Sequence, residues 1–71
     1  MAKALKYIYP GLRSRMAYKG EGVEELAAVL GLSNDSIRRR LSGRSDFELT
    51  EIKKLIVHYE CSFNDLFELQ D

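Results

Sequence analysis

Three consecutive arginines, Arg38 to Arg40, are the side chains in this sequence best suited to binding chemistry. A planar guanidinium group donates two hydrogen bonds at once, in a geometry that matches O6 and N7 of a guanine base. Just before the arginines, the Asn34 amide can bind adenine in the same two-bonded way, and the Asp35 carboxylate can accept a hydrogen bond from the amino group of cytosine. These side chains are suited to reading the edges of DNA bases.

The residues around these side chains predict two helices joined by a short turn. We expect the first helix over about residues 23–30 and the second over about residues 34–42, with Gly31 in a left-handed conformation between them. Ala27 has the small side chain needed where two helices cross, and Ser33 is a suitable N-cap for the second helix. The apolar seam between the helices consists of Leu26, Leu30, Leu32, Ile37 and Leu41. This is the layout of a helix-turn-helix, which places its second helix in the DNA major groove.

Helical geometry gives the three arginines different directions. At about 100° per residue, Arg39 and Asp35 point nearly opposite to Ile37, the residue expected to be most buried, whereas Arg40 lies only about 60° from it. We therefore expect Arg39 to contact a base, and Arg38, on the flank, to contact a base or a phosphate. We expect Arg40 to lay its methylene groups along the core edge with its charge reaching outward, with packing as its first role and phosphate binding as its second.

Three roles are open to Asp35. It lies four residues before Arg39, the spacing of an intrahelical ion pair worth about 0.2 to 0.5 kcal/mol, so it can brace Arg39 and orient its guanidinium group. It can also contact a base directly, or act only by stabilising the positive N-terminal end of its helix.

Five short motifs make the chain from about residue 11 to residue 67 similar to the lambdoid phage repressor and Cro family, the XRE-type helix-turn-helix proteins, and especially to short members found in prophages. The motifs are Gly11-Leu12-Arg13-x-x-Met16, Glu25-Leu26-Ala27, Gly31-Leu32-Ser33, Leu41-Ser42-Gly43-Arg44 and Ser62-Phe63-Asn64-Asp65-Leu66-Phe67. The resemblance implies a compact all-α domain of five helices, sequence-specific DNA binding, and a phosphate contact by Arg44 in the loop after the third helix. One position departs from the pattern, because Val23 stands where many members have a phosphate-binding glutamine or serine; the backbone N–H groups there remain available to a phosphate.

The expected partner is therefore double-stranded DNA, bound in its major groove. The expected DNA contacts are Ser33, Asn34, Asp35, Ser36, Arg38, Arg39 and Arg44. Arg13, Arg15 and Lys19 are weaker candidates for phosphate contacts, and Lys53 and Lys54 are expected on a solvated helix face.

The charge is balanced overall but unevenly distributed. A formal net charge of zero and a pI near 6.6 argue against a general polyanion binder. Residues 1–19 carry five positive charges and no negative one, and residues 34–44 carry four arginines against Asp35, whereas the chain after Arg44 sums to minus five. We expect one cationic face, built from the first and third helices; the alternative is that the arginines are only a solvated surface.

The length of 71 residues predicts one small domain over residues 11–71, preceded by a short N-terminal arm over residues 1–10. There is no room for a separate dimerisation domain, so a homodimer would have to be built from this fold. Ala4 to Tyr9 is expected to be extended, either packed across the helices of its own chain or paired with a second subunit. The sequence predicts neither a membrane span nor a signal peptide, which favours the cytoplasm.

The remaining helices are predicted from apolar spacing and caps. The first is expected from about residue 11 or 12 to Lys19, with Leu12 and Met16 on the core side. Phe47 and Leu49 are expected to anchor the chain before the fourth helix. The fifth helix is expected to begin at a Ser62 capping box. The core is expected to receive a stripe of residues from the fourth helix and two inward residues from the fifth: Ile52, Leu55, Ile56, Tyr59, Leu66 and Phe67.

No residue pattern predicts catalysis. A single cysteine, Cys61, and a single histidine, His58, make neither an intrachain disulfide nor a zinc site, and both are expected to be structural. There is no phosphate-binding glycine loop and no nucleophile paired with a base, so we expect no enzyme activity, no cofactor and no small-molecule ligand.

These features predict a DNA-binding transcriptional regulator, of the phage or prophage repressor type. Two identical subunits would bind two half-sites about one helical turn apart in a near-palindromic operator. The alternative is a protein-interaction module of the same fold, such as an antitoxin-like or anti-repressor partner, that binds DNA weakly or not at all. Val23 and the zero net charge favour that alternative.

Overall fold

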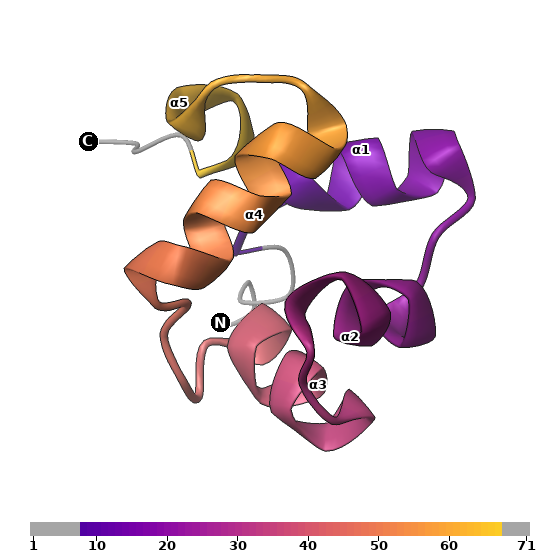
Figure 1. The fold of residues 1–71 in the computed structure, drawn as a ribbon, viewed down its shortest axis with the longest axis vertical. Helices are drawn as coiled ribbons and strands as arrows, with labels where there is room; N and C mark the ends of the chain where they lie inside the picture. The colour runs from indigo at the N-terminus through magenta and orange to yellow at the C-terminus, as the bar shows by residue number, and fades with distance from the viewer. Residues whose placement is uncertain (1–7, 68–71) are drawn as a thin grey trace, which may run out of the picture.

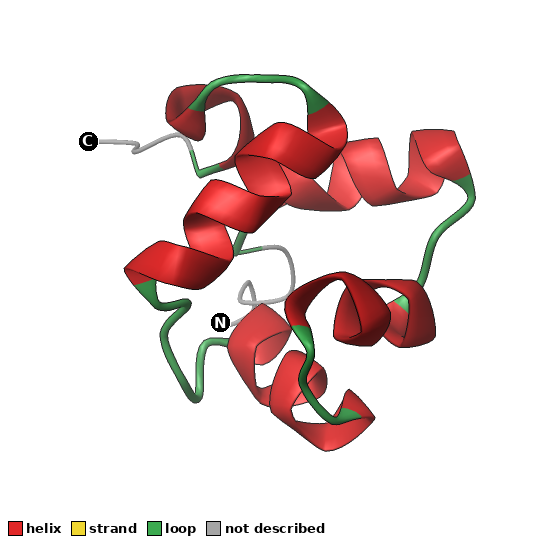
Figure 2. Ribbon diagram, in the orientation of Figure 1, coloured by secondary structure: helices red, strands yellow, loops and turns green. Residues whose placement is uncertain are grey.

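Pro10 opens the first of five helices, and glycine follows each of the first three. The computed structural model describes residues 8–67 and arranges the helices around a shared apolar core (Figure 1). The helices are α1 (Pro10–Lys19), α2 (Val23–Leu30), α3 (Asn34–Ser42), α4 (Leu49–Tyr59) and α5 (Phe63–Leu66). Residues 8–67 contain no strand, so the all-α fold predicted from the sequence is confirmed (Figure 2).

The turn between α2 and α3 forms as the sequence predicts. Gly31 adopts a left-handed conformation with φ of 70°, which an L side chain rarely adopts, and its N–H bonds the Ala27 carbonyl. The N–H of Leu32 bonds the same carbonyl at 3.0 Å. Ser33 then caps α3, because its hydroxyl accepts a hydrogen bond from the N–H of Ser36 at 3.1 Å. The turn thus pairs the Ala27 carbonyl near the end of α2 and the Ser36 N–H at the start of α3.

Gly11 allows α1 and α5 to pack with their backbones in close approach. A Cβ atom at position 11 would lie 2.0 Å from the carbonyl oxygen of Asp65, a separation that no side chain can accept. The two ends of the described chain are therefore joined through a position that requires glycine.

The core receives side chains from every helix and from the loop before α4. Its buried apolar members are Leu12, Met16, Leu26, Ala27, Leu30, Ile37, Leu41, Phe47, Leu55, Tyr59, Leu66 and Phe67. Ile52 and Ile56 are half-buried at its edge. The prediction that Leu49 anchors the chain is wrong: its side chain is 66% exposed. Phe47 alone provides the anchor, and Leu49, as the first residue of α4, points away from the core.

Tyr9 belongs to an aromatic cluster that joins distant parts of the chain. Its ring packs edge to face against Phe47 and Phe67, with centroids 5.6 Å and 5.2 Å away. Burial, with a contribution from the Asp46 charge, raises the pKa of Tyr9 above its ordinary value. Residues 1–7, and with them most of the predicted N-terminal arm, lie outside the described residues.

None of the helices formed by residues 8–67 is long and apolar enough to cross a membrane.

Candidate nucleic-acid interface

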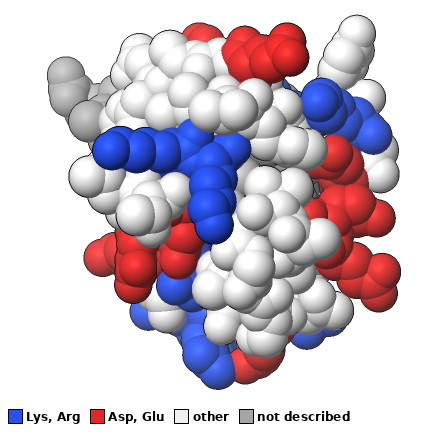
Figure 3. All heavy atoms as spheres, viewed as in Figure 1, with Lys and Arg blue, Asp and Glu red and all other residues white. Residues whose placement is uncertain are grey.

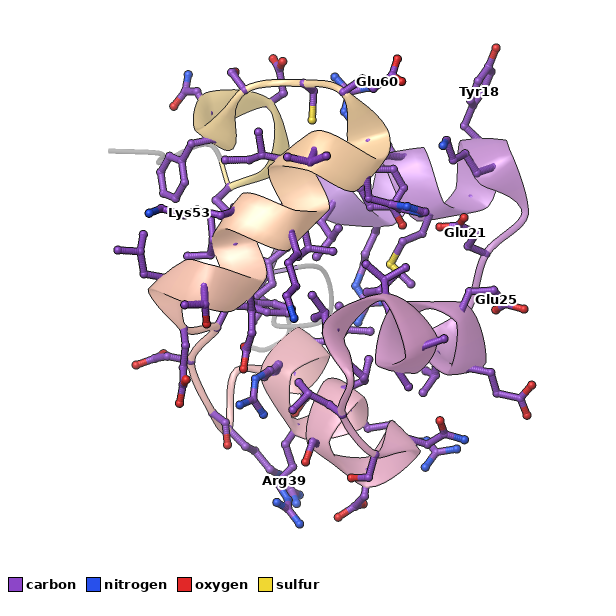
Figure 4. All side chains as sticks on the ribbon, viewed as in Figure 1. Tyr18, Glu21, Glu25, Arg39, Lys53 and Glu60 are labelled. Atoms are coloured by element: carbon purple, nitrogen blue, oxygen red, sulfur yellow. The ribbon has the colours of Figure 1, made fainter. Side chains whose placement is uncertain are left out.

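The two sides of α3 have different surroundings. Ile37 and Leu41 are buried on the inner side, whereas Asp35, Arg38 and Arg39 are exposed on the outer side. Arg39 points away from the body of the protein at the lower end of the view (Figure 4). The directions expected from the helical spacing are those observed for these residues.

The outer side of α3 forms a shallow concavity of about 360 Å³ with the loop that follows it. Its lining residues are Asp35, Arg38, Arg39, Ser42 and Arg44. Ser42 was not among the residues predicted to contact DNA. It lies seven residues after Asp35 and three after Arg39, so helical spacing alone places it on the same face. Both basic and acidic side chains are visible at this end of the molecule, and acidic ones gather on the two flanks, one of them beside the start of α2 (Figure 3).

Arg39 forms an ion pair with Asp35 across one turn of α3. The Nη2 atom of Arg39 lies 2.5 Å from Oδ2 of Asp35, and the two side chains are 50% and 67% exposed. The contact uses one nitrogen of the guanidinium group. Within the described chain, its other N–H groups have no protein acceptor, so they are available to a ligand.

Arg38 and Arg44 flank this pair. Both are exposed, and neither forms an ion pair with another residue of the range 8–67. The backbone of Arg44 is fixed, because α3 ends at Gly43 with φ of 89° and the Arg44 N–H bonds the Arg39 carbonyl at 2.9 Å. The concavity thus has a defined rim with two cationic side chains free to meet an anion.

Three of the residues predicted to contact DNA lie outside the concavity, at the start of α3. Ser33 uses its hydroxyl for the helix cap and also donates to Oγ of Ser36 at 3.1 Å. Asn34 and Ser36 are half-buried in the first turn. The structure therefore separates the predicted set into an arginine-rich group in the concavity and a polar group at the helix start.

Arg40 differs from the prediction, because its charge does not reach outward. Its Nε and Nη2 atoms donate to Oε1 and Oε2 of Glu51, at 2.8 Å and 3.1 Å. The side chains of the pair are only 13% and 9% exposed. The phosphate role proposed for Arg40 is thus wrong: α4 places a carboxylate within reach of the guanidinium, and a buried charge is stable only when it is paired.

The pair changes the protonation equilibria of both residues. Burial alone would raise the pKa of Glu51, but hydrogen bonds from Arg40 and from the Glu48 N–H, with the Arg40 charge, outweigh it and hold that pKa below its ordinary value. The hydrogen bond to Glu51 raises the pKa of Arg40. Both groups are charged across the neutral range.

The basic residues described in α1 do not join α3 in one cationic face, which corrects that expectation. Arg13 donates to the Leu41 carbonyl at 3.4 Å and so does approach α3. Arg15 instead lies 3.7 Å from the Asp65 carboxylate, at α5. Lys19 donates to the His58 carbonyl at 3.4 Å, at the end of α4. The three side chains reach three different elements. Arg15 lies about 200° around α1 from Arg13, and Lys19 lies one turn after Arg15 on the same face, at the end of α1, where it meets α4.

The start of α2 is acidic. The Gly22 N–H bonds Oε1 of Glu25 at 2.7 Å, and Glu24 and Glu25 are both exposed in the first turn. Val23 is half-buried against the core. These carboxylates complement the positive end of the helix dipole, which leaves this helix start less attractive to a phosphate than a neutral one.

His58 has a structural partner. Its Nε2 atom lies 3.0 Å from both carboxylate oxygens of Glu21, and the Tyr59 hydroxyl donates to Oε1 of Glu21 at 2.8 Å. Burial opposes ionisation of Glu21, but the hydrogen bonds from Tyr59 and His58 lower its pKa below the ordinary value. Cys61 is half-buried at the core edge. The described residues contain no group of three or more His, Cys, Asp or Glu side chains that could hold a metal ion.

Comparison with known proteins identifies a family. A family model described as the BetR domain matches residues 12–71, which include nearly all of α1 and every later helix. No curated protein matches the sequence.

Proposed function

Because the chain belongs to the BetR domain family and exposes an arginine-rich helix, we propose that it is a sequence-specific DNA-binding regulator that inserts α3 into the major groove. The concavity formed by α3 and Arg44 is the observation that carries this proposal. It presents three arginines on one surface, and helix-turn-helix geometry supplies the orientation in which such a helix meets base edges.

The side chains in the concavity suggest separate tasks. Arg39 reads a guanine with the donors that Asp35 leaves unused. Arg38 reads a base or holds a phosphate on the groove wall. Arg44 holds a phosphate, because it lies just past the end of the helix on a backbone that is fixed by hydrogen bonds.

In its finer form, the proposal is a repressor of the lambdoid Cro or CI type, from the XRE class and encoded by a prophage. Two identical subunits bind a near-palindromic operator, with half-sites about one helical turn apart. The protein acts in the cytoplasm and binds DNA without catalysis or a cofactor. The resemblance in the motifs and the helix-turn-helix layout support this form.

A protein-interaction module is the second candidate. Glu24 and Glu25 at the start of α2, together with the apolar Val23, weaken a phosphate site that helix-turn-helix proteins use. An antitoxin-like or anti-repressor partner with this fold would keep the core and use α3 to bind protein.

Selection of bound sequences from a random DNA pool, followed by a salt titration, tests the proposal. Log affinity should fall with log salt concentration by about 0.9 for each neutralised phosphate, which gives a slope of about 2 to 3 for each subunit if Arg44, Arg38 and one further group contact phosphates. Lys53→Gln is a matched control, because Lys53 is exposed on α4 and lies outside the concavity. No enrichment, and no retention on DNA at low salt, would favour the interaction module.

A further inference from the structure

Glu51 is a charged residue in the core, and its carboxylate is held from two directions. It is 7% exposed, and no other charged residue in the range 8–67 is buried to that extent. One oxygen accepts a hydrogen bond from the Glu48 N–H at 3.0 Å, within the capping box that starts α4. The same oxygen and its neighbour bind Arg40. The start of α4 therefore orients the carboxylate that α3 meets.

Arg40 is fixed equally well on the side of α3. Besides its two bonds to Glu51, its Nη1 atom donates to the Ser36 carbonyl at 3.4 Å, one turn earlier in the same helix. The guanidinium plane is thus held against the backbone of α3 and the first turn of α4. A rotation of α3 about its own axis would break this arrangement.

The apolar contacts of α3 define its rotation less strictly. Ile37 and Leu41 pack into the core together with Leu30 of α2. Burial of apolar surface is favourable in any orientation that excludes water, whereas a two-bonded contact between arginine and a carboxylate requires a particular plane and distance. The polar pair is therefore the element that can select one rotation of the helix.

We propose that Glu51 is a positioning residue for DNA recognition. By holding Arg40, it fixes the rotation of α3 and so the direction in which Arg39 and Asp35 point. This inference rests on the proposed function of α3. Glu51 itself faces the core, so it governs discrimination between DNA sequences without touching DNA.

A double variant, Arg40→Met with Glu51→Leu, separates positioning from stability. It replaces the buried ion pair with apolar side chains, a change that is often neutral or stabilising for the fold. We expect the melting temperature to stay the same or rise. We expect the ratio of affinities for the selected site and for its single-base variants to fall about tenfold, because bases read through α3 each contribute a discrimination of that order. Affinity for unrelated DNA and the salt slope should not change, since Arg44 is untouched.

Two single variants show whether the two-bonded geometry or the charge matters. Arg40→Lys keeps the charge but loses the planar group, so it should lose discrimination as the double variant does. Glu48→Gln removes a charge three residues before Glu51 and leaves the pair intact, so it should keep the wild-type ratio. If the double variant fails to fold, Arg40→Lys gives the same comparison.

The proposal is overturned if the double variant and Arg40→Lys both fold and still discriminate between the selected site and its single-base variants as well as the wild type does. If the wild-type chain binds no DNA, the proposed function is refuted instead. The effect of Glu51 on the orientation of α3 is then measured in the free protein. Residual dipolar couplings should report a changed orientation of α3 relative to α2 and α4 in the double variant. An unchanged orientation would overturn the positioning role by itself.

Discussion

Arg39 and Arg40 are adjacent in the sequence and each pairs with a carboxylate, yet the two pairs differ in burial and in what they join. The pair of Arg39 with Asp35 lies within α3, and its side chains are 50% and 67% exposed. The pair of Arg40 with Glu51 joins α3 to α4, and its side chains are 13% and 9% exposed. One helix thus carries a surface pair and a core pair, on different sides.

This difference decides what each pair can do. An exposed pair contributes little to stability, and either partner can exchange the other for water or a ligand at small cost. A buried pair cannot lose one partner without leaving a charge in apolar surroundings. The exposed pair of Asp35 and Arg39, the outer pair, is therefore suited to binding. The buried pair of Arg40 and Glu51, the inner pair, is suited to holding α3 in place.

Removal of one inner partner should give the largest effect on stability. We expect Glu51→Ala to lower the free energy of unfolding by about 3 to 5 kcal/mol, because Arg40 is left buried and unpaired. Chemical denaturation followed by circular dichroism measures this change. Asp35→Ala is the matched removal of the outer carboxylate, and we expect it to cost no more than about 1 kcal/mol, because both partners of that pair are exposed. Equal losses would show that burial does not distinguish the two pairs.

Acid should weaken the inner pair less than Glu51→Ala does, because protonation removes the charge of Glu51 but keeps its side chain. The folded-state pKa of Glu51 lies below its ordinary value of 4.5, so the stability that the pair contributes is present above about pH 4.5 and is lost as the pH falls through the folded-state pKa. The free energy of unfolding should therefore decrease in acid. Glu51→Gln should make this decrease shallower, whereas Glu48→Gln should leave it close to wild type. A decrease of wild-type steepness in Glu51→Gln would assign the acid sensitivity to other carboxylates, such as Glu21.

Loss of an outer arginine should change binding and leave folding nearly intact. Arg39→Ala should weaken binding to the selected DNA site by about 1 to 3 kcal/mol and relax the preference at one base pair, since a base edge differs between sequences. Arg44→Ala should weaken binding to all sequences alike and lower the salt slope by about 1, since a phosphate is the same in every sequence. Binding assays on the selected site and on its single-base variants, at several salt concentrations, separate the two outcomes. The assignment of Arg39 to a base fails if its variant loses the same affinity on every sequence.

Local sequence signals predicted the helices and the outer side of α3. The bounds of α2 and α3 follow from a glycine after each helix, a serine cap and apolar residues at helical spacing, and all of these act within a few residues. The directions of Ile37 and Arg39 follow from the same spacing. Leu49 was mispredicted because an apolar residue next to a helix start can face either way, and only the position of α4 decides.

The inner pair could not be predicted, because it depends on how two helices lie in space. Arg40 and Glu51 are eleven positions apart in the sequence, in helices joined by a loop, and no local spacing brings them together. Helical geometry placed Arg40 near the core edge, but it did not show that a carboxylate would be there. For the same reason, the contacts of Arg15 with α5 and of Lys19 with α4 were missed. The tertiary partner of each basic residue depends on the packing of the helices.

The smallest expected effect concerns the coupling between Asp35 and Arg39, and it tests whether the outer pair acts as a unit in binding. The contact at 2.5 Å holds one nitrogen of the guanidinium group and so limits the directions in which the remaining donors can point. If Asp35 braces Arg39 in this way, the Asp35→Ala variant should bind the selected site more weakly, but the double variant with Arg39→Ala should bind little more weakly than Arg39→Ala alone. The reason is that a brace has nothing to hold once the arginine is gone. Losses that simply add would assign Asp35 an independent contact with a base or a role limited to the helix end. The stability of the double variant relative to Arg39→Ala then separates these two, because the ion pair is absent from both. A role at the helix end still lowers the free energy of unfolding by about 0.3 to 1 kcal/mol in the absence of DNA, whereas a base contact appears only in the complex.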